Sequence, residues 1–461
     1  MAVAIHARER SHNGLFVGIG LIVVAIYLWF LFHLMNTSTW DTWGAMLIGP
    51  VLFVAVLPAL ARQARREADQ RVFWFLVVAL AVKFGFSIAR WYHAFYIVDG
   101  ADARGYDMLG TQIALRFLHG NFHTGLHDLY DSNYIRFFTG LVYTVIRPSV
   151  VSGFLIYAWL AFWGTFFFYR AFVLAVPNGN RWSYARWLFF MPSILFWPSS
   201  IGKESWMMFG LGIAAFGAAK MISERLMPGF LISALGIGLA ALVRAPIAVV
   251  FGAGLVVAGI LRRPNRERLR ELGAITRFAT FALFTVVLIV LGATMKDYLT
   301  RSGVTGTSTN ALVNYSLDAT SSGGSEFHPT LITSPTSAAL ATVTVLYRPF
   351  IFETPHSVEG VVSTLEATIL LGFSVLRFRS FLAAFRNVRR VPYVALVIVY
   401  IAGSIFALSP VANFGIIVRQ RTLIYPMFLV LLCFSAARRG SARRGTAPTN
   451  AVARPPAEAR T

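Results

Sequence analysis

Two aspartates, Asp99 and Asp102, stand at residues 98–106, where the first long polar segment of the chain follows an apolar run. A carboxylate at such a boundary can act as the general base that takes a proton from an attacking hydroxyl. It can also bind a divalent cation through its oxygens or cap a following helix. We expect Asp102 to be catalytic, with Asp99 as the second candidate. We expect Asp107 to cap a helix that begins at Met108.

Lys203 and Glu204 follow a corner rich in proline and serine at residues 190–202. Prolines break the helix there and free backbone N–H groups at the start of the next one. A helix N-terminus with a lysine beside it is a natural anion site. Alternatively, Lys203 and Glu204 pair with each other, or the lysine extends to the lipid headgroups. We expect this corner to contact a phosphate or another part of the substrate.

Arginines recur near the ends of several later apolar runs. The planar guanidinium donates in a fork that fits phosphate oxygens. Arginines at membrane ends also bind ordinary lipid headgroups, so each one alone leaves both interpretations open. Together with neighbouring side chains, the candidate residues for binding substrate or phosphate are Lys203, Glu204, Arg244, Arg348, Glu353, Arg419, Arg421 and Tyr106.

Three ionisable residues, Lys83, Arg90 and Glu366, lie inside apolar runs. Such residues usually pair with one another or line a water-filled cavity, and we expect the same here. The chain has no phosphate-binding loop of the Walker type and no Gly-x-Ser-x-Gly elbow. A nucleotide-driven mechanism is therefore not expected, and no cofactor is indicated apart from the divalent cation considered above.

The elements that hold these residues follow from composition. Of the 461 residues, 57% are hydrophobic and only 13% are charged, against about 25% charged in soluble proteins. Apolar runs of about 18 residues, each long enough to cross a bilayer, recur along the chain. The pattern predicts an all-α polytopic membrane protein with about twelve transmembrane helices, at residues 15–35, 44–60, 72–96, 150–169, 187–201, 205–219, 229–243, 246–261, 278–295, 358–376, 393–408 and 423–437.

The net charge of +21 is explained by topology rather than by nucleic-acid binding. With the N-terminus in the cytoplasm, most basic residues and few acids fall on the cytoplasmic side, as the positive-inside rule requires. Both termini are then cytoplasmic. Residues 1–437 form one membrane domain, and residues 438–461 form a basic, disordered tail.

The same charge count places two long loops, residues 97–149 and 296–355, on the outer side of the membrane. Each contains an apolar segment that would reverse the downstream topology if it crossed the membrane alone. We therefore expect two interfacial helices on the outer face, at residues 134–146 and 338–352. The two loops are expected to form the active-site face, since long loops in compact proteins are usually functional.

Three short motifs carry a resemblance to known enzymes: Asp-Ala-x-x-Tyr at residues 102–106, Pro-Ser-x-x-Phe-Trp-Pro-Ser-Ser-x-Gly-Lys-Glu at residues 192–204, and Arg-Pro-Phe-x-x-Glu at residues 348–353. In these, the chain resembles the GT-C class of membrane glycosyltransferases of bacterial polysaccharide assembly, and in overall character also the Wzy-type polymerases. GT-C enzymes use polyprenyl-phosphate-linked sugars at the outer face of the cytoplasmic membrane.

The resemblance implies a multi-pass enzyme of the bacterial cytoplasmic (inner) membrane with its active site on the outer face. Its partners would be a polyprenyl-phosphate-linked sugar donor, a glycan or glycolipid acceptor and membrane lipids, and no nucleic acid. Asp102 or Asp99 would deprotonate the acceptor while the cationic groups stabilise the departing phosphate. Two alternatives stay open: a Wzy-like polymerase of lipid-linked oligosaccharides, and a lipid or glycan transporter.

Overall fold

The computed structural model describes residues 2–98, 102–261, 326–353 and 357–435, together with single positions between 289 and 320. Within these residues the elements are helices, and the only extended pairing is an isolated bridge between Glu326 and Asn413. The all-α prediction is confirmed. Asp99, most of the predicted span at residues 278–295 and the predicted tail at residues 438–461 lie outside the described residues.

The helices follow one another with short connections over most of the chain. The first part contains α1 (Ala2–Thr37), α2 (Trp40–Glu67), α3 (Gln70–Tyr92) with the π-helical turn η1 (His93–Ile97), α4 (Asp102–Leu118), α5 (Asp131–Ile146), α6 (Val150–Ala175), α7 (Arg181–Phe190), α8 (Pro192–Phe196), the 3₁₀ turn η2 (Trp197–Ser199) and α9 (Lys203–Ser223). The second part contains α10 (Leu226–Leu261), α13 (Pro335–Tyr347), the 3₁₀ turn η4 (Ile351–Glu353), α14 (Val358–Leu376), α15 (Phe378–Arg386), α16 (Pro392–Leu408), α17 (Phe414–Arg421) and α18 (Tyr425–Leu432).

Among the described helices, seven are long and apolar enough to cross a membrane. An eighth span results if the pair α17 and α18, which meet at 60°, counts as one broken span. The molecule is therefore built as a multi-pass membrane protein. The predicted number of about twelve spans and the cytoplasmic position of both termini stay predictions.

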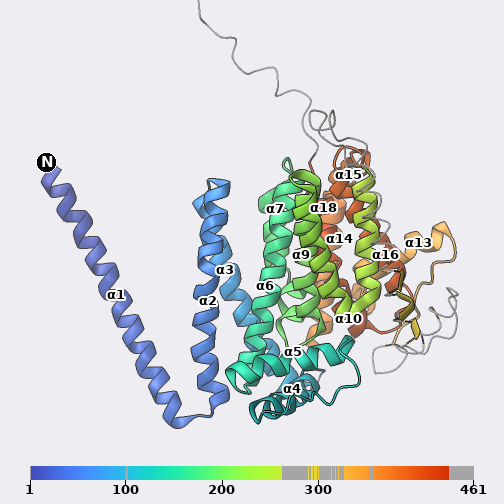
Figure 1. Cartoon of the computed structure of the whole chain (residues 1–461). Coiled ribbons are helices and arrows are strands. Elements are labelled where there is room, and N and C mark those ends of the chain that lie inside the picture. Colours follow the sequence, from blue (N-terminus) through green and yellow to red (C-terminus); the bar gives the residue numbers. More distant parts are fainter. Residues whose placement is uncertain are drawn as a thin grey trace, which may run out of the picture.

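The helices form a bundle with a second layer at one end. In Figure 1, α6, α9, α10 and α16 run side by side through the bundle, while α4 and α5 lie across its lower end. α1 stands away from the bundle and approaches it only near α2. The crosswise position of α5 agrees with the interfacial helix expected at residues 134–146. The corresponding helix expected at residues 338–352 is shorter, because α13 ends at Tyr347 and a separate turn follows.

The predicted span at residues 187–201 is broken into α7, α8 and η2. The break follows Met191, because Pro192 cannot donate a hydrogen bond to the preceding turn. Inside a membrane such freed backbone groups need internal partners. Lys83 Nζ donates to the carbonyl of Ile194 at 2.8 Å, and the Glu366 carboxylate accepts from the backbone N–H of Ser193 at 2.5 Å.

Of the two alternatives expected for Lys83, Arg90 and Glu366, pairing with one another is wrong for Lys83 and Glu366. Both are buried, and both bind the backbone of the broken α7–α8 segment. The physical reason is that this backbone exposes donors and acceptors at a depth where water is scarce. The two charged groups thus hold in place the corner that leads into α9.

α10 contains both predicted spans at residues 229–243 and 246–261, joined at Arg244. Arg244 has φ −142° and ψ 83°, which is not helical, and Pro246 follows two residues later. Before this break α10 packs against α9, and after it the chain packs against α16, where a Cβ at Gly254 would meet the Leu396 carbonyl at 2.9 Å. The break brings Arg244 to the start of α9, where it meets Glu204.

Glycines allow α9 and α10 to approach each other closely. A Cβ added at Gly236 would lie 2.3 Å from the backbone nitrogen of Ala214, whereas one added at Gly238, on the same helix, would meet nothing within 4 Å. Small residues at such crossings are typical of membrane helix packing. The α9–α10 contact is therefore a rigid support for the residues at its lower end.

We expect Gly236→Ala to lower the free energy of unfolding by about 1–3 kcal/mol, because the added methyl overpacks the crossing. Gly238→Ala is the matched control and should be neutral or stabilising by up to about 1 kcal/mol, since alanine favours helix more than glycine does. Unfolding of both variants in the same detergent measures the difference. Equal stability of the two variants would contradict the close packing.

Candidate functional site

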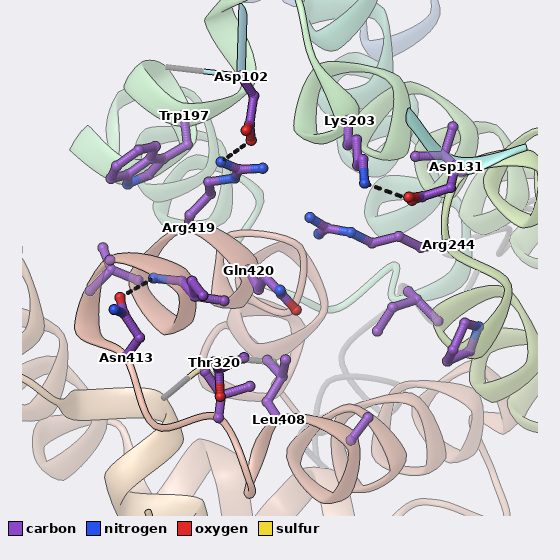
Figure 2. A pocket seen from close by; sticks show the side chains of 18 of the residues that line it. Asp102, Asp131, Trp197, Lys203, Arg244, Thr320, Leu408, Asn413, Arg419 and Gln420 are labelled. Carbon is purple, nitrogen blue, oxygen red and sulfur yellow. Dashed lines mark hydrogen bonds and ion pairs between the residues drawn. The ribbon is translucent and has the colours of Figure 1, made fainter. Parts of the chain in front are cut away.

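A cavity of about 1380 Å³ opens at the end of the bundle that carries α4 and α5. The first residues of α4, α5, α9 and α17 all line it. Helix N-termini carry a positive partial charge, so their convergence favours an anion in this space. The polar end of the cavity holds the side chains of Asp102, Asp131, Lys203, Arg244 and Arg419, which point toward one another in Figure 2.

A chain of charged side chains crosses the polar end of the cavity. Arg419 Nη1 donates to Asp102 Oδ2 at 2.8 Å, and its Nε donates to Glu204 Oε1 at 2.7 Å. Arg244 Nη2 donates to the same Glu204 oxygen at 2.8 Å. The Glu204 side chain is only 5% exposed, whereas that of Asp102 is 57% exposed. Glu204 therefore orients two arginines from inside, and Asp102 presents its carboxylate to the cavity.

The local sequence explains why these groups meet. Gly202 ends the broken segment and α9 begins at Lys203, which places Glu204 in the first helical turn, where a carboxylate is favoured. α17 is capped by Asn413, whose side chain accepts from the N–H of Ile416 at 3.2 Å, and Arg419 follows on its last turn. Figure 2 shows the Asn413 cap below Arg419. The corner at Gly202, the break in α10 and the capped helix α17 thus position Glu204, Arg244 and Arg419.

Lys203 does not pair with Glu204, as one interpretation of the sequence allowed. Its Nζ lies 2.6 Å from Asp131 Oδ1. Asp131 is the first residue of α5 and has φ 53°, a left-handed conformation that is uncommon outside glycine. Aspartate tolerates this region better than most residues. One signal for Asp131 was present in the sequence, since it is an acidic residue just before an expected helix, but we expected that helix to begin three residues later.

Arg90 joins the cavity wall from α3. Its Nη1 contacts His93 Nδ1 at 2.7 Å, and its guanidinium lies 4.8 Å from the ring of Phe196 and 4.9 Å from that of Trp197. His93 Nε2 in turn pairs with Glu359 from α14. A guanidinium only donates, so Nδ1 is the acceptor and Nε2 carries the proton toward Glu359. His93 lies in the π-helical turn η1, a feature frequent at functional sites, and sequence reasoning missed it.

Tyr106 is buried beside the polar end, with its hydroxyl 3.4 Å from the Ser132 hydroxyl. Burial, assisted by the nearby carboxylates of Asp102 and Glu204, raises the pKa of Tyr106 to about 12. At neutral pH its hydroxyl is therefore protonated. Tyr106 therefore helps to shape the site, and its hydroxyl does not act as a proton acceptor at neutral pH.

Asp107 does not cap a helix. α4 begins at Asp102 and not at Met108, so Asp107 lies inside the helix and its Oδ1 accepts from the Tyr143 hydroxyl at 2.6 Å. Burial raises the pKa of the Asp107 carboxyl. The earlier start places Asp102 in the first turn of α4, where the helix dipole favours its negative charge.

Arg348, Glu353 and Arg421 are not brought to the cavity. Arg348 Nη2 lies 2.6 Å from Glu353 Oε1, and Arg348 Nη1 donates to the carbonyl of His328 at 3.1 Å. Arg421 is fully buried and donates to the carbonyl of Arg348. These three residues hold the η4 turn against α17. We expected all three to bind substrate, but in the structure they bind one another and nearby carbonyls instead.

Apart from its polar end, the cavity has an apolar lining, which we call the apolar arm. Ile247 and Val250 of α10 and Gly403 and Phe406 of α16 line this part. Phe406 is 45% exposed, so this lining offers accessible apolar surface. A cavity with a charged end and an apolar arm fits an amphiphile with an anionic head better than it fits a wholly polar solute.

A buried donor at the polar end lacks an acceptor among the described residues. Arg244 Nη1 is buried and has no hydrogen-bond partner in the described part of the chain. Leaving such a donor unpaired costs about 1–3 kcal/mol, which a bound anion would recover. No group of three or more histidine, cysteine, aspartate or glutamate side chains in the described segments is arranged to hold a metal ion, so the geometry gives a divalent cation no evident cage.

The charged end, the apolar arm and the paired Asp102 describe a site that could bind a lipid-linked anion and offer a carboxylate to a second substrate. No protein-family model, curated protein or solved structure matches this chain.

Proposed function

We propose that this protein is a membrane glycosyltransferase that moves a sugar from a polyprenyl-phosphate-linked donor to a glycan or glycolipid acceptor. The observation that carries the proposal is the Asp102–Arg419 pair at the charged end of a cavity whose other arm is apolar. A carboxylate beside arginines suits a reaction that needs both a base and an anion site. The proposed location is the outer face of the bacterial cytoplasmic membrane.

In the proposed reaction the acceptor hydroxyl attacks the anomeric carbon of the donor sugar. The Asp102 carboxylate takes the hydroxyl proton as the new carbon–oxygen bond forms. The bond from the anomeric carbon to the phosphate oxygen breaks, and the lipid phosphate leaves with the bonding electrons. Arg244, Arg419 and Lys203 stabilise the negative charge that develops on the departing phosphate.

The buried Glu204 gives the arginines their fixed geometry. Because one carboxylate holds both guanidinium groups, neither has to reorganise when charge develops on the phosphate. Preorganised donors in a site shielded from water contribute more than mobile ones. The apolar arm beside α10 and α16 would accept the first isoprene units of the donor lipid.

A Wzy-like polymerase of lipid-linked oligosaccharides is the second candidate. It is favoured by one observation: Arg419 stands between the two carboxylates and bonds to both, so an arginine and not the aspartate occupies the centre of the site. Both candidates use the same lipid-linked class of donor. They differ in whether the acceptor is itself a second lipid-linked glycan.

The test is direct incubation of the purified protein, reconstituted in lipid nanodiscs, with polyprenyl-phosphate and polyprenyl-diphosphate sugars and candidate acceptors. Mass spectrometry should detect an acceptor enlarged by one sugar, or by a whole repeat for a polymerase, together with the released lipid phosphate or diphosphate. The matched control is the Asp102→Asn protein in the same nanodiscs. Absence of transfer from every lipid-linked donor, with the protein folded, would count against both candidates.

A further inference from the structure

The ion pair between Lys203 and Asp131, like that between Arg419 and Asp102, includes an exposed carboxylate, whereas the pairs of Glu204 are buried. The Lys203 side chain is 16% exposed and that of Asp131 is 59% exposed, whereas Glu204 is 5% exposed. Pairs that include an exposed partner contribute little stability, because water competes for both groups. The Lys203–Asp131 contact can therefore be exchanged, while the contacts of Glu204 cannot.

Arg244 is held in place by its ion pair, whereas Lys203 can exchange its ion-pair partner. One guanidinium nitrogen of Arg244 is held by buried Glu204, and the other has no acceptor among the described residues. Figure 2 shows this guanidinium directed into the space between Arg419 and Lys203, with Asp131 on the far side of the lysine. The space is thus bordered by one fixed cation with an unused donor and by one cation whose present partner is a weakly held carboxylate.

We infer that Asp131 is a positioning residue that takes the place of the substrate's phosphate while no substrate is bound. The phosphate binds between Arg244 and Lys203, and it replaces Asp131 as the partner of the lysine. The inference rests on the proposed function, because it takes the phosphate to belong to a lipid that lies in the apolar arm. Asp131 is expected to hold Lys203 in the cavity while the site is empty, and to compete with the phosphate for it.

Removing a residue from a binding site usually weakens binding, but here we expect removal of the Asp131 carboxylate to strengthen the binding of phosphate. In Asp131→Asn the lysine has no competing carboxylate, so a phosphate should bind more tightly. The expected gain in affinity is about twofold to fivefold, the range set by the strength of an exposed ion pair. Asparagine tolerates the left-handed conformation of residue 131 as well as aspartate does, so the start of α5 should be preserved.

The experiment measures binding of farnesyl phosphate to the full-length protein in nanodiscs, with inorganic phosphate and farnesol as the separate head and tail. Asp131→Asn should tighten binding of farnesyl phosphate and leave binding of farnesol unchanged. A gain with inorganic phosphate alone, and none with farnesyl phosphate, would assign the site to a free anion and overturn the lipid part of the inference. The same substitution in a Lys203→Gln background should have no effect, because the two residues act as a pair.

Unchanged or weaker binding of farnesyl phosphate by Asp131→Asn would overturn the inference, and so would an equal gain in the Lys203→Gln background. These outcomes are separate from those that test the function. If farnesyl phosphate binds as expected but no donor yields a product, the glycosyltransferase proposal fails and the phosphate site stands. If sugar is transferred but Asp131→Asn does not tighten phosphate binding, only the role of Asp131 fails.

Discussion

Asp102→Asn should reduce sugar transfer by at least about 100-fold, the lower range of what a positioned general base contributes. Asparagine keeps the size and shape of the side chain, and its carbonyl oxygen can still accept from Arg419, so the fold and the donor's affinity should be preserved. What is lost is the acceptor for the proton of the attacking hydroxyl. The measurement is the initial rate of transfer, together with the KM for the lipid-linked donor.

The matched control for this substitution lies one and a half turns along the same helix. Asp107→Asn removes a carboxylate of α4 that bonds to Tyr143 and does not line the cavity. It should leave the rate of transfer within about twofold, since most substitutions away from a site change little. A normal rate of transfer by Asp102→Asn would contradict the assignment of Asp102 as the base.

Comparison with Arg419→Ala separates the two candidate functions. If Asp102 is the base of a single-sugar transferase, Asp102→Asn should be the more severe of the two changes in maximal rate. In a polymerase that relies on the central arginine, Arg419→Ala should be the more severe. Arg419 contacts both Asp102 and Glu204, so the stability of that variant must be measured alongside its rate.

Several residues that the sequence singled out meet at one end of the bundle, and there are physical reasons for this. Asp102, Lys203 and Arg244 each stand where an apolar run stops, and ionisable groups at such positions are costly unless they serve a cavity or one another. The prolines at residues 192 and 246 marked breaks that the structure contains. Both signals are local, so a single sequence carries them.

What the sequence could not supply is the direction in which a side chain points. Arg348 and Arg419 both lie near the same end of the bundle, yet Arg348 pairs with Glu353 and Arg419 reaches Asp102. Which face a short helix turns toward a cavity depends on packing against distant elements. Asp131 was missed for the same reason, because its contact with Lys203 joins α5 to α9 across 72 residues of sequence.

Glu204→Ala should be the most destabilising single change at the site. The substitution leaves Arg244 and Arg419 without their shared buried carboxylate, and breaking a buried pair by removing one partner costs about 3–5 kcal/mol. Because Arg419 also orients Asp102, the rate of transfer should fall together with the stability. Unfolding in one detergent and the initial rate at a temperature where the variant is folded give the two readouts.

A double substitution distinguishes electrostatic support from simple packing. Glu204→Gln alone should leave Arg244 without a carboxylate and Arg419 with Asp102 alone. Glu204→Gln combined with Arg244→Gln removes one charge of each sign and should recover part of the lost stability. Glu353→Ala serves as the control, because it breaks the ion pair with Arg348 outside the cavity. That variant should lose stability while the folded protein keeps its rate of transfer. If Glu204→Ala unfolded at the same temperature as the unchanged protein, or if the double substitution recovered nothing, Glu204 would not be the centre that positions both arginines.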